Sequence, residues 1–177
     1  TLHTSPAIKL AWQTVSAQAG ISLDEIAHFD IYSCFPSAVL VACNEIGLQP
    51  LDHRGVTVTG GLPFFGGPGN NYSLHAIAQM AATLRAGAGG HGLVTANGMY
   101  LTKHSLGLYS TQPPAQGWSD TDNGALQRQI DAAPRMTIRQ RHHRNLDCQL
   151  RSRGPAARHR HRAQRCRRTD RRQHPSG

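Results

Sequence analysis

The order of helical and strand patterns along the chain constrains its fold more than any other feature. Three segments carry apolar residues at helical spacing, and they are residues 6–19, 36–46 and 73–86. A glycine follows each segment, at Gly20, Gly47 and Gly87. Because glycine readily adopts the left-handed conformation that closes a helix, these three positions predict helix ends.

Candidate strands lie between and after these helices. Apolar and β-branched residues mark them at residues 29–32, 55–59, 91–99 and 105–110. The resulting order is helix, strand, helix, strand, helix, strand, strand. Such alternation predicts an α/β fold, in which helices cover the faces of a layered, mostly parallel or mixed sheet.

The distribution of charge divides the chain into unlike parts. Residues 1–138 contain six basic and eight acidic residues, whereas residues 139–177 contain 13 arginines and two aspartates. The basic tail has few large apolar side chains, so we expect it to be disordered. The polar residues after Thr111 indicate a linker. The sequence therefore predicts a domain over 1–111, a linker over 112–138 and a tail over 139–177.

Several classes of protein are excluded or disfavoured. No apolar run reaches the ~18 residues of a membrane span, and the first residues do not resemble a secretory signal. The four cysteines form no CxxC pair, so we expect neither a metal site nor a disulfide scaffold. We interpret the chain as cytoplasmic and reduced. Its first residue is threonine, which suggests that it begins inside a longer reading frame.

Four short motifs follow one another in a definite order. They are Ser5-Pro6-Ala7, residues 29–35 (FDIYSCF), the glycine-rich residues 60–68 and residues 94–98 (VTANG). This set resembles the C-terminal half of thiolases, most closely the sterol-carrier-protein-type, thiolase-like acetyl-CoA acetyltransferases of actinobacteria. The resemblance extends over roughly 100 residues, from Ser5 to Ser110.

The resemblance implies both a fold and a chemistry. The fold would be the C-terminal half of a thiolase, with a layered mixed sheet and helices on its faces. The activity would be acyl transfer in lipid metabolism, with a coenzyme A thioester as substrate or ligand and no tightly bound cofactor. The nucleophilic cysteine of thiolases lies in an N-terminal half that this chain lacks. We therefore expect the partner to be that missing half or, in a homo-oligomer, another copy of the chain.

Three motif positions depart from the family pattern. Gly67 stands where the family has the histidine of its Gly-His-Pro loop, and Tyr32 replaces an asparagine or histidine. Asn97 lies where the family places a cysteine. A thiol needs a base, and a developing enolate needs hydrogen-bond donors. We predict a catalytically degenerate, thiolase-like protein that binds acyl-CoA, and whether it is an enzyme stays open.

The candidate site residues each admit a second interpretation. The candidate catalytic residues are Tyr32, Cys34, Asn97 and His104. The candidate ligand-binding residues are Gly66, Gly67, Asn70, Asn71 and Gly98. Cys34 and Tyr32 could instead be packed residues at a strand end, His104 a surface histidine, and the asparagines turn formers. The glycines match no nucleotide-binding motif, so they favour close backbone approach to a ligand or loop.

Two further function classes remain open. The chain could be a non-catalytic acyl-CoA-binding or scaffold protein that assembles with a second polypeptide. Alternatively, the arginine-rich tail could bind nucleic acid nonspecifically. The tail could instead be translated from a shifted reading frame, because hydrophobic periodicity ends near Ile138.

Overall fold

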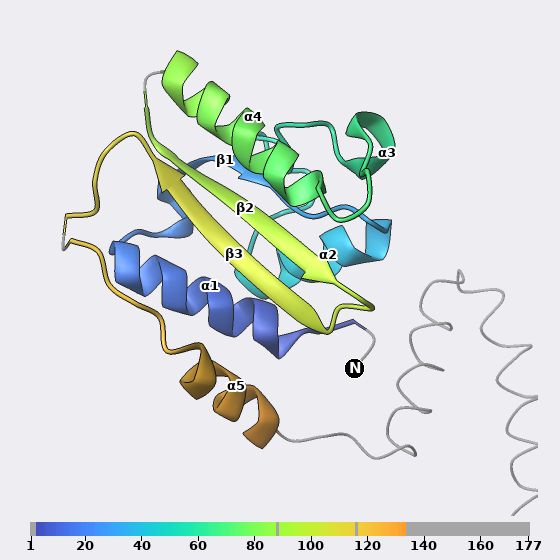
Figure 1. The fold of residues 1–177 in the computed structure, drawn as a ribbon, viewed down its shortest axis with the longest axis vertical. Coiled ribbons are helices and arrows are strands. Elements are labelled where there is room, and N and C mark those ends of the chain that lie inside the picture. Colours follow the sequence, from blue (N-terminus) through green and yellow to red (C-terminus); the bar gives the residue numbers. More distant parts are fainter. Residues whose placement is uncertain (1–2, 88, 116, 134–177) are drawn as a thin grey trace, which may run out of the picture. The chain divides into compact units, whose positions relative to one another are not determined.

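The computed structural model describes residues 3–87, 89–115 and 117–133, and the predicted tail lies outside them. The three predicted helices and three of the four predicted strands are present in the predicted order (Figure 1). Further helical elements join them, so the described residues form nine elements. They are α1 (Pro6–Ala19), the 3-10 turn η1 (Leu23–Glu25), β1 (Ile26–Asp30), α2 (Pro36–Ile46), α3 (Leu62–Phe65), α4 (Tyr72–Ala86), β2 (His91–Gly98), β3 (Lys103–Ser110) and α5 (Asn123–Ala132).

The three strands form one mixed sheet in the order β1-β2-β3. β1 pairs with β2 in parallel, and β2 pairs with β3 in antiparallel orientation. In the second pairing Asn97 lies opposite His104. The predicted α/β class with a mixed sheet is therefore confirmed, and the register brings two candidate site residues side by side.

Helices pack on both faces of the sheet. Alternate residues of β2 point to opposite faces, so Leu93 joins a core with α1 and α2, whereas Val94 packs against α4. Figure 1 shows α4 on one side of the sheet and α1 with α2 on the other. Both faces of β2 are thus covered, which matches its run of buried residues.

The helix boundaries agree closely with the prediction, but one of the three glycine ends does not. Gly20 and Gly47 adopt left-handed conformations, with φ of 68° and 83°. Gly87 instead has φ −92° and ψ −170°, which is extended backbone. The chain therefore leaves α4 without a left-handed turn, and a residue with a side chain could stand at this position.

The predicted strand at residues 55–59 is wrong. These residues form a loop after α2 that lies beside the end of β1, where Ile31 N donates a backbone hydrogen bond of 2.9 Å to Val56 O. The reason is a competing acceptor, because Val58 and Thr59 direct their N–H groups to the carboxylate of Asp30. Residues whose donors are used in this way cannot build a strand ladder.

Helix α5 lies within the range interpreted as a linker. Asp122 accepts a hydrogen bond of 2.9 Å from Ala125 N and so caps its first turn. Leu126 and Ile130 are partly buried and lie four residues apart. One side of α5 therefore packs toward α1, which the polar composition of this region concealed.

Candidate functional site

The candidate residues Cys34 and Asn97 meet where β1 and β2 end. β1 leads through Tyr32 to Cys34, and Asn97 lies near the end of the neighbouring β2. Asn97 Nδ2 lies 3.3 Å from Cys34 Sγ, which joins two residues 63 positions apart in the sequence. The other amide atom, Asn97 Oδ1, is buried and has no hydrogen-bond partner among the described residues.

Tyr32 is fixed beside this pair through its backbone and its ring. Its N–H donates to Thr95 Oγ1 at 2.8 Å. Its ring meets the ring of Tyr72 edge to face, with centroids 5.5 Å apart. Tyr32, Asn97 and His104 line one small cavity inside the fold. The structure therefore brings all four candidate catalytic residues into the same neighbourhood.

His104 is held away from the thiol by other contacts. Its Nε2 lies 3.1 Å from Ser5 Oγ and 3.1 Å from Leu101 O. Partial burial lowers the pKa of the imidazole, because the charged form would lose hydration. His104 therefore has the contacts of a packed, structural histidine. Among the described residues, the polar partner of Cys34 is Asn97.

A buried carboxylate organises the loops around the pair. Asp30 is fully buried, and its Oδ2 accepts hydrogen bonds from Thr57 Oγ1, Val58 N, Thr59 N and Thr59 Oγ1 at 2.9–3.2 Å. Its Oδ1 accepts a 2.8 Å hydrogen bond from Tyr72 OH. Burial raises the pKa of Tyr72, so the phenol keeps the proton that it donates. We call these five residues the Asp30 cluster.

The Asp30 cluster fixes the backbone beside Cys34. Gly61, which follows the cluster, donates to Thr59 Oγ1, and Leu62 N donates to Ser33 Oγ at 2.9 Å. A Cβ on Gly61 would lie 2.8 Å from Ser33 Oγ, so only glycine fits this approach. The cluster was not predicted from the sequence. Its one signal was a carboxylate between the apolar residues Phe29 and Ile31, where burial requires partners.

The predicted ligand-binding residues of the glycine-rich loop lie between α3 and α4. Gly66 has a positive φ of 85°, and Asn71 immediately precedes α4. Asn71 Nδ2 lies 3.0 Å from His75 Nε2, and its carbonyl accepts from the first turn of the helix. Gly67 and Asn70 are exposed. These contacts match the turn-forming interpretation, and a ligand-binding role for the loop stays a prediction.

Gly98, the remaining candidate, is the last residue of β2. It lies opposite Lys103 in the antiparallel pairing. A Cβ at this position would lie 3.3 Å from Lys103 Cβ, which is a tight contact. Gly98 therefore has a packing reason to be glycine, and its role toward a ligand is untested.

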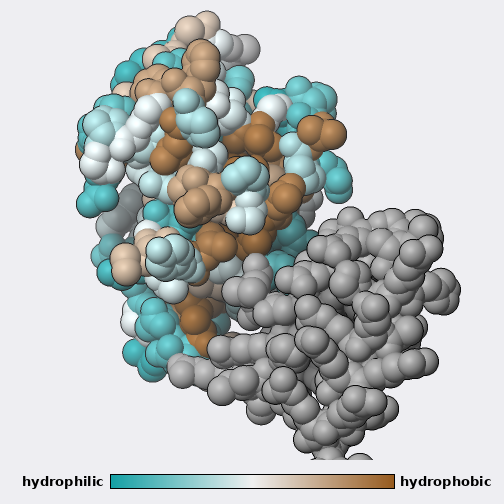
Figure 2. Space-filling model, turned by 90° about the vertical axis from the view of Figure 1, so that its right-hand side faces the viewer, coloured by the Kyte–Doolittle hydropathy of each residue, from teal (hydrophilic) through white to brown (hydrophobic). Residues whose placement is uncertain are grey.

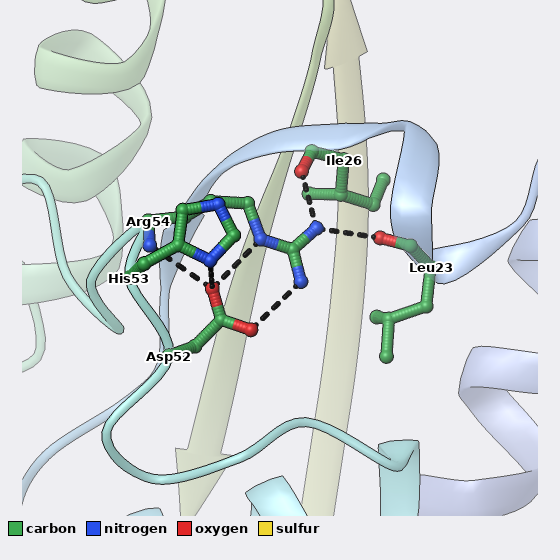
Figure 3. Close-up of polar contacts among 5 residues, drawn as sticks. All are labelled: Leu23, Ile26, Asp52, His53 and Arg54. Atoms are coloured by element: carbon green, nitrogen blue, oxygen red, sulfur yellow. Dashed lines mark hydrogen bonds and ion pairs between the residues drawn. The ribbon is translucent and has the colours of Figure 1, made fainter.

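Arg54 binds the backbone at the start of β1 (Figure 3). Arg54 donates to both carboxylate oxygens of Asp52, at 2.8 and 2.9 Å, and to the carbonyls of Leu23 and Ile26, each at 2.9 Å. Its guanidinium also lies 4.8 Å from the ring centroid of Phe29. Hydrogen bonds from Arg54 hold the pKa of Asp52 well below its usual range. This pair supports the scaffold and touches none of the candidate site residues.

The side of the molecule toward which β2 runs has apolar surface (Figure 2). Large apolar residues that are exposed in the described part of the chain include Phe35, Phe64, Phe65, Leu74 and Met99. No helix in the described ranges is long and apolar enough to cross a membrane. The described residues also contain no group of His, Cys, Asp and Glu that could hold a metal ion.

Comparison with known proteins finds similarity among solved structures. No family model matches the chain, and no curated protein matches it either. Among solved structures, it is similar to a monomeric SCP2-thiolase-like protein type 1 from Mycobacterium smegmatis, with a TM-score of 0.70 and 47% sequence identity. The match covers 76% of this chain and 30% of the mycobacterial chain. The chain therefore spans less than a third of that relative.

Proposed function

Since this chain belongs to the thiolase superfamily, we propose that the ends of β1 and β2 form part of a binding site for acyl thioesters of coenzyme A. The observation that carries the proposal is the contact between Asn97 Nδ2 and Cys34 Sγ. It places an amide donor and a thiol together in a partly buried position, beside the small cavity that Asn97 helps to line.

The chemistry of these two groups suits a thioester. An asparagine amide has two N–H donors, so one can contact the thiol while the other is directed to a carbonyl oxygen. A donor in a poorly hydrated position stabilises negative charge on a thioester oxygen more strongly than water does. Asn97 would act as this donor, and the Asp30 cluster would keep the surrounding loops in place.

The same contact favours binding without acyl transfer. A cysteine becomes a nucleophile or proton carrier when a base or a positive charge stabilises its thiolate. Here the contact of Cys34 is a neutral amide, Gly67 replaces the family histidine, and His104 is bonded to Ser5 and Leu101. We therefore propose that this chain binds acyl-CoA and turns it over very slowly or not at all.

A scaffold role is the second candidate, and the exposed apolar residues favour it. Phe64 is 84% exposed and Met99 is 74% exposed. Soluble monomers rarely expose large apolar patches, so such patches mark surfaces that bind a partner. The matched relative is more than three times longer than the matched region. We propose that the partner is the remainder of a thiolase fold, in the same polypeptide or another one.

Calorimetry on the full chain tests the binding proposal. We expect acetyl-CoA and acetoacetyl-CoA to bind and thiolysis to be undetectable in parallel. Asn97→Ala should weaken binding about tenfold, because it removes a hydrogen bond made in a poorly hydrated site. Asn44→Ala, on the exposed face of α2, is the matched control. Turnover would contradict the degenerate site, whereas failure of a folded chain to bind either thioester would contradict the function itself.

Cysteine alkylation gives an independent measurement. Cys34 is partly exposed and Cys43 is fully buried. Burial also raises the pKa of the Cys43 thiol, so this residue should react slowly. We expect acetyl-CoA to protect Cys34 from iodoacetamide, as measured by peptide mass spectrometry. Equal labelling with and without acetyl-CoA would place the ligand elsewhere.

A further inference from the structure

A larger cavity adjoins the small one that Asn97 helps to line, and the two cavities share His104 and Leu106. It has a volume of about 470 Å³ and opens between α1, α5 and the start of β3. Volumes of this size are typical of small-molecule sites in proteins. α1 and α5 lie side by side in Figure 1, on the face of the sheet away from α4.

The walls of this cavity combine apolar and polar side chains. Leu10 and Val15 of α1, Leu106 of β3, and Leu126 and Ile130 of α5 form the apolar part, and Thr14, Asn123 and Gln127 are among the polar residues. The α1 wall extends from Ala7 to Gln18, which is about 16 Å at 1.5 Å per residue. An elongated, flexible alkyl chain therefore fits these walls better than a compact ring does.

The two ends of the cavity differ in their polarity. At the C-terminal end of α1, Gln18 and Thr121 bind each other through hydrogen bonds of 2.9 and 3.1 Å, so their polar groups are satisfied. Lys103 and His104 line the cavity where β3 begins. His104 also contacts Ser5, immediately before α1, which places the basic residues at the opposite end of the helix.

The lining has positive charge and no compensating negative charge. Lys103 is the residue with a permanent charge among those that line the cavity, and no Asp or Glu lines it in the described part of the chain. Lys103 also takes part in none of the ion pairs between described residues. A ligand with a negative head group would supply the missing partner.

We propose that this cavity binds an unbranched aliphatic carboxylate, with the alkyl chain between α1 and α5 and the carboxylate at Lys103. Apolar walls favour burial of the chain, and the single cation orients it. This cavity shares His104 and Leu106 with the small cavity beside Asn97, but Lys103 lines the larger cavity and not the small one.

Calorimetric titration of the full chain with decanoate is the primary test, with decanol and decylammonium as probes of equal chain length. We expect decanoate to bind three- to fivefold more tightly than decanol, the range for one exposed charge pair, and decylammonium to bind more weakly than either. Equal affinity for all three would indicate an apolar groove without charge selection, and it would overturn the proposal. Absence of decanoate binding by the folded chain would overturn it as well.

Variants locate the ligand and separate binding from folding. Lys103→Gln should weaken decanoate binding three- to fivefold and leave decanol binding unchanged, and Lys103→Arg should retain the wild-type affinity. Arg128→Gln removes an exposed cation of α5 that does not line the cavity, so it is the matched control. Ala11→Leu should fill part of the cavity and weaken decanoate and decanol alike, with thermal unfolding as the check on folding. Unchanged binding in both Lys103→Gln and Ala11→Leu would overturn the assignment.

Competition with decanoyl-CoA distinguishes the free acid from the acyl chain of a thioester. We expect decanoyl-CoA to leave decanoate binding unchanged. Direct competition, lost in Ala11→Leu, would mean that this cavity holds the acyl chain of the thioester, and it would overturn a separate carboxylate site. Failure of decanoate binding with intact acetyl-CoA binding would leave the proposed function standing.

Discussion

At the residue scale, the carboxylate of Asp30 is the centre of a buried hydrogen-bond network. Its carboxylate is inaccessible to solvent and accepts from two backbone N–H groups and three hydroxyls. A buried carboxylate is tolerated when donors replace its lost hydration. Each donor comes from the loop after α2 or from α4, so this one side chain joins three parts of the chain.

Asp30→Asn should lower the free energy of unfolding by about 2–4 kcal/mol. Asparagine keeps the shape but presents an NH₂ group to donors, so at least one N–H or hydroxyl loses its acceptor. Urea denaturation followed by circular dichroism measures the change. Asp120→Asn, at an exposed position, is the control and should have little effect. Equal stability of the two variants would show that the Asp30 cluster is not stabilising.

His104 should make the stability of the fold depend on pH. Burial lowers its pKa below the ordinary value near 6.5, so the unfolded chain binds more protons than the folded chain between these two values. The free energy of unfolding should therefore fall as pH decreases from about 7 toward 5. His104→Gln should reduce this slope, whereas His53→Gln, at an exposed position, should leave it unchanged. Urea denaturation at several pH values provides the measurement, and identical slopes for wild type and His104→Gln would contradict it.

At the element scale, the helices follow from local sequence while their exits depend on context. α1 and α2 each begin with proline in the first turn and end at a left-handed glycine, and these glycine ends are the ones that the sequence predicts. α4 ends at a glycine whose backbone is extended. The same residue type thus serves two different roles, and the direction of the following chain decides which.

A pair of glycine substitutions tests this difference. Gly47→Ala should lower the free energy of unfolding by about 1 kcal/mol, because alanine is strained at φ 83°. Gly87→Ala should be neutral or slightly stabilising, since its backbone is extended and a Cβ would meet Thr83 O at an ordinary 3.4 Å. Thermal and urea denaturation of both variants provide the comparison. A loss of similar size at Gly87 would mean that α4 ends as the sequence alone suggests.

At the scale of the whole molecule, the acidic domain and the arginine-rich tail have different properties. The 13 arginines of residues 139–177 give that segment the charge needed for nonspecific nucleic-acid binding. The similarity to the thiolase-like relative covers 76% of the chain, whereas the division into domain, linker and tail and the function of the tail stay predictions. Deletion of the tail tests its function separately from that of the preceding residues.

Removing residues 139–177 should reduce affinity for a mixed-sequence DNA duplex at least tenfold and flatten its dependence on salt concentration. Acetyl-CoA binding should be unchanged, because the proposed site lies within the described residues. Fluorescence anisotropy with a labelled duplex measures the first effect, and calorimetry measures the second. Retained DNA affinity would assign the binding to the domain instead of the tail.

The sequence by itself determined the helices α1, α2 and α4, the order of the three observed strands, the mixed α/β class and the thiolase resemblance. Helical periodicity and glycine at helix ends act between neighbouring residues, so they can be read without a structure. The strand predicted at residues 55–59 failed for the opposite reason. Its hydrogen-bond donors bind Asp30, which lies nearly 30 positions earlier. The local sequence pattern does not indicate so distant a partner.

The tertiary structure decided which candidate residues belong together. It joined Cys34 to Asn97 through the parallel pairing of β1 and β2, and it set His104 opposite Asn97 through the pairing of β2 and β3. It also formed the cavity between α1 and α5, although residue composition had indicated a linker there. Contacts between distant segments depend on strand register and helix packing, and these are properties of the assembled fold.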